Sequence, residues 1–229
     1  MWLSPSEGEA LRLSLSVAVR SVVLNLPPAI AIAWLLTRGR FVGRTFLDAL
    51  VHLPLVLPPV VVGYGLLLLF GARGILGSWL QQTAGLELVF TTNGAALATA
   101  VMTFPLMVRA IRISLEGVDR GLEDAARTLG AGSLDRFATV TLPLIVPGIL
   151  AGIITAFSAA LGEFGAGITF VSNIPGATRT LSLALYTALQ EPGGEHAAAR
   201  LAGLSVALGL TGLLLAEWLA RRVRRRLGQ

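Results

Sequence analysis

The chain has 229 residues, of which 54% are hydrophobic and only 14% charged, whereas soluble domains carry about 25% charged residues. A water-soluble core could not bury so many apolar side chains, which excludes an ordinary soluble domain and predicts an all-α protein that crosses the membrane several times. All 18 basic residues are arginine and cysteine is absent. A lysine-bearing phosphate loop, a disulfide framework and thiol catalysis are therefore excluded.

Five apolar stretches are predicted to cross the membrane, and prolines interrupt the first two. The predicted spans cover residues 11–36, 47–70, 94–108, 143–161 and 201–219. Pro27 and Pro28 should kink the first span. Pro54, Pro58 and Pro59 interrupt the second so often that neighbouring protein must cover its unpaired backbone groups.

A further apolar segment, residues 181–189, has helical spacing but is too short to span. We expect it to form an outer interfacial helix or a re-entrant element. A sixth span would require this segment to cross together with a second partner segment, which the sequence does not reveal. The glycine-rich loop 71–93 is expected outside.

Arginine placement predicts the orientation. One side receives Arg38, Arg40 and Arg44, the arginines of the loop between the third and fourth spans, and those of the C-terminal tail. Positive charge favours the cytosol. The chain is therefore predicted to be a multi-pass protein of the plasma (inner) membrane with its N-terminus outside and its C-terminus inside. Residues 11–219 would form one membrane domain and residues 220–229 a basic cytoplasmic tail.

The charged loop 109–143 should contain an amphipathic helix followed by a second short one. Apolar residues recur there at steps of three and four, which places them on one helix face: Leu115, Val118, Leu122, Ala125 and Leu129. Gly130 is expected to end the first helix in a left-handed conformation. Ser133 is expected to cap the second helix, and Leu142-Pro143 to open the fourth span.

The spacing of this loop resembles the EAA loop of permeases from ABC importers, which runs Glu-Ala-Ala, three residues, Gly, nine residues, Ile, one residue, Leu-Pro. Here Asp124 and Val140 replace the glutamate and the isoleucine, and Glu123 precedes Asp124. The resemblance implies a type I ABC importer permease fold in which the loop is a cytoplasmic coupling helix seated in a groove of an ATPase. The residues expected to couple to the ATPase are Glu123, Asp124, Ala125, Ala126, Gly130, Leu142 and Pro143.

Further segments look like those of molybdate permeases. They are residues 53–71, 103–112, 142–176 and 180–190. The resemblance implies transport of a tetrahedral oxyanion, molybdate first, with tungstate or sulfate/thiosulfate as alternatives. It also implies two cytosolic ABC ATPase subunits and an extracytoplasmic oxyanion-binding protein as partners. Five spans are too few to enclose a pathway, so a second copy of the chain is expected beside the first, in contact with membrane lipid.

Neither an active site nor a cofactor or metal site is expected. His52 and His196 are far apart in sequence, and His52 is more simply a packed, hydrogen-bonded residue than a ligand. The chain is therefore not expected to be an enzyme by itself. The arginines follow membrane topology, so nucleic acid is not an expected partner.

An ion-coupled secondary carrier is the alternative from another class, and it would need carboxylates within its spans. Asp48, Glu163 and Glu217 all lie near predicted span ends, which argues against such a carrier. Within the first span, Arg20 should be paired inside protein, and Glu163 is the expected partner for this intramembrane or pathway site.

Overall fold

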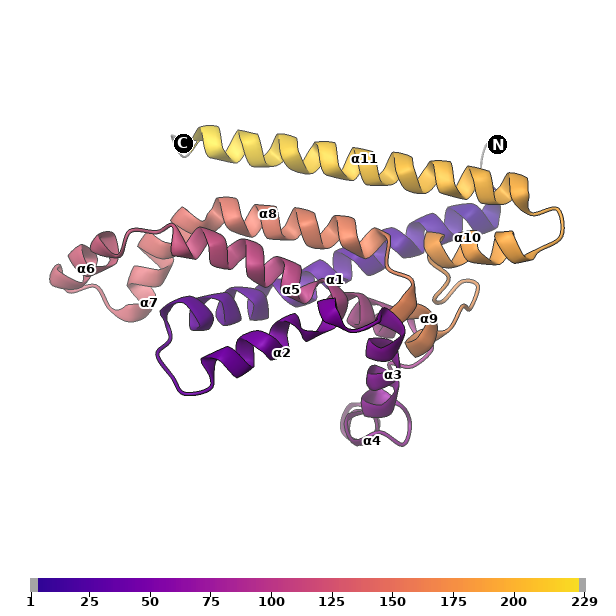
Figure 1. The fold of residues 1–229 in the computed structure, drawn as a ribbon, viewed down its shortest axis with the longest axis horizontal. Coiled ribbons are helices and arrows are strands. Elements are labelled where there is room, and N and C mark those ends of the chain that lie inside the picture. Colours follow the sequence, from indigo (N-terminus) through magenta and orange to yellow (C-terminus); the bar gives the residue numbers. More distant parts are fainter. Residues whose placement is uncertain (1–3, 227–229) are drawn as a thin grey trace.

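The computed structural model describes residues 4–226, and none of these residues forms a strand. Long helices run along the long axis of the molecule and short helices lie at its ends and on one side (Figure 1). The long helices are α1 (Pro5–Arg38), α5 (Thr92–Glu116), α8 (Leu142–Leu161) and α11 (Glu195–Arg226). The others are α2 (Arg44–Val56), α3 (Pro59–Phe70), α4 (Ile75–Ala84), α6 (Arg120–Thr128), α7 (Ser133–Arg136), the π-helix Phe137–Thr141, α9 (Gly165–Val171) and α10 (Leu181–Gln190).

In the described part of the chain, four helices are long and apolar enough to cross a membrane, or up to five if the bent pair α2–α3 counts as one span. The second predicted span, 47–70, is interrupted as expected, because α2 and α3 meet at an angle of 115°. Leu57 (ψ 145°) and Pro58 (ψ 134°) are both extended there. A residue before proline disfavours the helical conformation, and each of these two residues precedes a proline.

Pro27 and Pro28 lie inside α1, which continues through both prolines. Most of the predicted basic tail, 220–229, is helical, since α11 continues to Arg226, whereas residues 227–229 lie outside the described part. The segment 181–189 does form a short helix, α10, as expected.

The core is built where α1, α5 and α8 meet, because small residues let these helices approach closely. A Cβ placed on Gly148 of α8 would collide with Ser114 of α5, and one on Gly152 would press on Met107. Met107 and Ile145 are fully buried in this contact. Gly148 and Gly152, four residues apart, therefore form a small-residue face on α8 that allows close contact with α5.

Buried polar groups also join these helices. The Asn25 amide of α1 donates to the Ala100 carbonyl (2.8 Å) and to the Thr103 hydroxyl (3.1 Å) of α5. At the other end of α1, the Ser14 hydroxyl accepts a hydrogen bond from the backbone N–H of Leu181 (2.7 Å). Satisfied polar pairs of this kind fix the register of helices that apolar packing alone would leave free to slide.

We predict that Gly148→Leu lowers the thermal unfolding midpoint of the purified protein, because forcing side-chain atoms into a filled contact costs about 1–3 kcal/mol. Gly203→Leu is the matched control, since Gly203 of α11 has no atom within 4 Å of an added Cβ. Unfolding followed by circular dichroism in detergent compares the two variants. Equal midpoints would contradict the close α5–α8 contact.

Candidate coupling site

Helix α6 is a short surface helix at one end of the molecule (Figure 1). It begins at Arg120 because the Asp119 carboxylate accepts a hydrogen bond from the backbone N–H of Gly121 (2.8 Å). The predicted single helix face from Leu115 to Leu129 is therefore wrong. Helix α5 ends at Glu116 and its Leu115 is fully buried, whereas Leu129 is 88% exposed.

The end of α6 confirms the expectation for Gly130. This residue has a φ of +88°, which glycine adopts without the penalty of a side chain. The N–H of Ala131 donates to the carbonyl of Ala126, and the N–H of Gly130 donates to that of Arg127, each at 3.0 Å. These two bonds form a Schellman motif, which turns the chain sharply away from the helix axis.

The path from α6 into the membrane helix α8 runs through α7 and a π-helical turn, Phe137–Thr141. The predicted cap at Ser133 is wrong, because Gly132 precedes α7 and Ser133 is its first residue. Leu142 donates to the carbonyl of Phe137 and begins α8, with Pro143 in its first turn as expected. Pro143 has no N–H to donate to the preceding turn, which favours a widened turn just before it.

Glu123 anchors α6 to the membrane helices. Its carboxylate oxygen Oε1 accepts from Nη2 of Arg38, the last residue of α1 (3.2 Å), and from the hydroxyl of Thr141 at the start of α8 (2.8 Å). Nη2 of Arg38 also lies 3.4 Å from the carbonyl of Val118. The side chains are only 11% (Arg38) and 20% (Glu123) exposed, so water screens this ion pair less than a surface pair.

The other predicted coupling residues of α6 lie at or near the surface, whereas Leu142 of α8 packs against the core. Asp124 and Ala125 are exposed, and Ala126 is half-buried. Three large apolar side chains of the same region are also exposed in the described structure: Leu122, Leu129 and Leu134, at 49%, 88% and 83% exposure. The motif position Asp124 thus lies on the surface, while its neighbour Glu123 forms the contact with α1 and α8. The outer face of α6 offers small residues and exposed leucines, which suit a partner groove.

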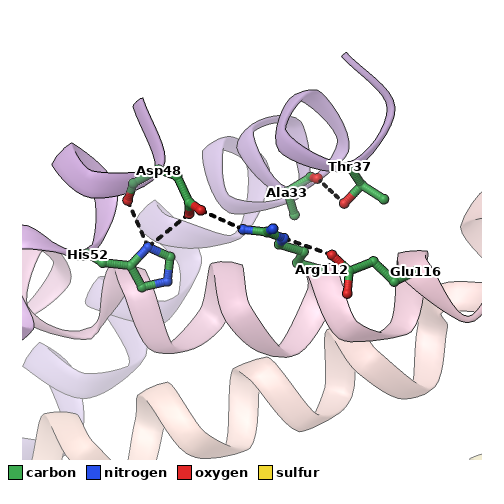
Figure 2. Close-up of polar contacts among 6 residues, drawn as sticks. All are labelled: Ala33, Thr37, Asp48, His52, Arg112 and Glu116. Carbon is green, nitrogen blue, oxygen red and sulfur yellow. Dashed lines mark hydrogen bonds and ion pairs between the residues drawn. The ribbon is translucent and has the colours of Figure 1, made fainter. Parts of the chain in front are cut away.

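A second polar cluster joins α2 to α5 (Figure 2). Asp48 binds Nη1 of Arg112 (2.9 Å), and Nε of Arg112 binds Glu116 (2.9 Å). Nδ1 of His52 lies 2.9 Å from the Asp48 carbonyl and 3.2 Å from its carboxylate. Both of these oxygens are acceptors, so Nδ1 carries the proton, and His52 is hydrogen-bonded as expected. Sequence reasoning missed this cluster, although two pairs at a spacing of four, Asp48/His52 and Arg112/Glu116, were visible.

The structure gives Arg20 and Glu163 different partners. Nη1 of Arg20 donates to the side-chain oxygen of Asn93 (2.7 Å), and both residues are exposed. The Glu163 carboxylate accepts from the backbone N–H of Ala166 (2.8 Å) at the start of α9. No ion pair joins Arg20 and Glu163 in the part of the chain that the structure describes.

We predict that Glu123→Gln weakens the attachment of α6 and lowers ATP-dependent solute uptake by the assembled transporter about tenfold. The amide oxygen of Gln can still accept from Arg38, but the charge that strengthens this bond is removed; a hydrogen bond to a charged group contributes about 1.5–3 kcal/mol, and 1.4 kcal/mol corresponds to a factor of ten. Asp124→Asn removes a neighbouring charge that has no such contact and serves as the control. If both variants transport alike, the Glu123 contact has no role in uptake.

The chain is similar to several known transport proteins. The family described as "Binding-protein-dependent transport system inner membrane component" matches residues 26–225. The chain is 56% identical to the molybdenum transport system permease protein ModB of Escherichia coli (strain K12), over 100% of both chains. It is 53% identical to ModB of Haemophilus influenzae, over 97% of each. The sulfate transport system permease protein CysT of Salmonella typhimurium is 39% identical, over 82% of this chain and 68% of that protein.

Solved structures share the fold at low sequence identity. A bacterial ABC transporter that imports the acidic polysaccharide alginate superposes with a TM-score of 0.76 at 18% identity, over 96% of this chain and 80% of that one. The MetNI methionine ABC transporter in an inward-facing conformation gives a TM-score of 0.69 at 16% identity, over 95% and 94%. The chain belongs to the family of binding-protein-dependent transport system inner membrane components.

Proposed function

We propose that this protein is the permease subunit of an ATP-driven molybdate importer. The observation that carries the proposal is the 56% identity to a molybdenum transport permease over the full length of both chains. The sulfate permease relative is more distant, at 39% identity and partial coverage. Tungstate is close to molybdate in charge and shape, so it is the next candidate solute.

Helix α6 is proposed as the element that receives the motion of a separate ATPase. Its exposed leucines and small alanines suit docking, and Glu123 links it to α1 and α8. A push on α6 would therefore reach two membrane helices through one side chain. ATP hydrolysis itself is assigned to the partner, because this chain lacks lysine and therefore a lysine-bearing phosphate loop.

The proposed assembly contains two copies of this chain, two cytosolic ATPase subunits and an extracytoplasmic binding protein. Large apolar side chains along α11 are exposed in the single chain, among them Leu210, Leu214 and Trp218. Lipid or a second copy would have to cover them. The proposed orientation places the N-terminus outside and both α6 and the C-terminus in the cytosol, following the arginine bias.

Vesicles that contain the permease, its ATPase and its binding protein test the solute. We predict ATP-dependent uptake of molybdate, competed by tungstate more strongly than by sulfate. Uptake driven by a proton or sodium gradient without ATP would instead support an ion-coupled carrier. ATP-dependent uptake of a sugar or amino acid, with none of the oxyanions, would refute the proposed solute class.

The coupling role of the α6 end has a matched test. We predict that Gly130→Asp abolishes either copurification with the ATPase or coupled uptake. A non-glycine residue at φ +88° costs about 1 kcal/mol or more, and this cost would shift the end of α6. Gly193→Asp is the control: Gly193 also has a positive φ (+78°) and free space around it, but it lies between α10 and α11. Normal copurification and uptake by Gly130→Asp would show that the turn after α6 is a simple connector.

The absence of natural cysteine permits a direct topology test. We predict that a membrane-impermeant thiol reagent labels Gly193→Cys but not Gly121→Cys in intact cells, and labels both after permeabilisation. Both glycines lie on exposed surfaces, so access alone decides the result. Labelling of Gly121→Cys from outside would reverse the proposed orientation.

A further inference from the structure

A polar cavity of about 300 Å³ lies at the junction of α1, α2, α5 and α6. Three arginines line it, each from a different helix: Arg38 at the end of α1, Arg44 at the start of α2 and Arg120 at the start of α6. Thr37, Glu116 and Val118 complete the lining. Segments distant in sequence thus bring three guanidinium groups to one small space beside the coupling helix.

The positive charge of this cavity is only partly compensated. Nη2 of Arg38 forms an ion pair with Glu123. The carboxylate of Glu116 is paired with Arg112, a residue that does not line the cavity. Arg44 and Arg120 have no ion pair or side-chain hydrogen bond within the described residues. In addition, Nε of Arg38 is buried and has no hydrogen-bond partner in that part of the chain.

A buried donor without an acceptor costs about 1–3 kcal/mol, so Arg38 has unused hydrogen-bonding capacity beside the cavity. A tetrahedral oxyanion supplies several acceptor oxygens. It also supplies a negative charge to pair with Arg44 and Arg120, which have no anionic partner within the described residues. Guanidinium groups bind phosphate through paired hydrogen bonds, which makes arginine the preferred residue for such groups. We infer that the Arg38–Arg44–Arg120 cavity binds a phosphate-like tetrahedral oxyanion.

The surroundings of the cavity allow two sources for this group. The connection between α1 and α2 and the start of α2 expose Phe41, Val42 and Phe46, at 39%, 105% and 74% exposure. Exposed apolar residues beside arginines fit the boundary between lipid and water, where an anionic lipid presents its phosphate. The cavity is also open to the aqueous side near α6, where free phosphate has access.

A bound oxyanion would tie α1, α2 and α6 together, because each of these helices contributes one arginine. It would therefore restrain the coupling helix through Arg120, independently of the Glu123 contact. The site does not depend on molybdate being the transported ion.

The test uses the full-length chain in nanodiscs, without ATPase or molybdate, so that its outcome is separate from that of the proposed transport function. The first arm titrates inorganic phosphate into nanodiscs of phosphatidylcholine alone, at constant ionic strength. The second arm replaces part of the lipid by phosphatidylglycerol in phosphate-free buffer. Both arms measure the thermal unfolding midpoint of wild type and of Arg44→Gln/Arg120→Gln. The control Arg40→Gln/Arg127→Gln removes the same charge from exposed arginines outside the cavity.

A rise in the midpoint with phosphate alone identifies a free anion, and a rise only with phosphatidylglycerol identifies a lipid headgroup. In either case the half-saturating phosphate concentration or lipid fraction should rise at least tenfold in Arg44→Gln/Arg120→Gln and stay within about twofold in the control. The single variants Arg44→Gln and Arg120→Gln should show intermediate losses, which guards against a folding defect of the double variant. The inference is overturned if wild type responds to neither probe, or if the control loses the response equally.

Discussion

The contact between Arg38, Glu123 and Thr141 is the interaction on which the coupling account depends. Helix α6 has nine residues, too few to be stable alone in water. Its position must therefore come from tertiary contacts, and it contributes no fully buried residue to the core. The Glu123 carboxylate accepts hydrogen bonds from the last residue of α1 and from the residue before α8, and so ties α6 to both membrane helices. A surface helix held by few contacts can be moved by a partner without unfolding the membrane helices.

The membrane part is built in the opposite way. Close glycine contacts between α5 and α8, and buried amide and hydroxyl bonds between α1 and α5, make a rigid unit. Beside this unit, α2 is separated from α3 by the extended Leu57-Pro58 link and is joined to α5 by the Asp48–Arg112 ion pair. The chain therefore combines a tightly packed centre with two outer helices, α2 and α6, each of which is tied to it by a charged side-chain contact.

Much of this arrangement was predictable from sequence, because it depends on local signals. Hydropathy located the spans, a glycine was expected in the left-handed turn at Gly130, and the Leu-Pro pair was expected to open α8. The break in the second span was also expected, because consecutive prolines act on the residues before them as well as on themselves. The helix face from Leu115 to Leu129 failed because Gly117 and the cap at Asp119 interrupt a regular apolar period.

The candidate site was only partly predictable. The motif pointed to Asp124, but the structure places Glu123 against Arg38, and a residue 85 positions away cannot be found from local spacing. The cavity formed by Arg38, Arg44 and Arg120 was likewise visible only once the helices were placed in space. Sequence reasoning therefore did not identify electrostatic contacts between residues that are distant in the chain.

A charge-exchange experiment tests the Arg38–Glu123 contact most directly. Arg38→Glu, Glu123→Arg and the double variant are compared for ATP-dependent molybdate uptake in reconstituted vesicles, with equal amounts of inserted protein. The account predicts that each single variant loses uptake and that the double variant regains a substantial part, because a like-charge clash becomes an ion pair again. Independent effects, with the double variant no better than the poorer single variant, would contradict the claim that this contact carries motion from α6 to the membrane helices.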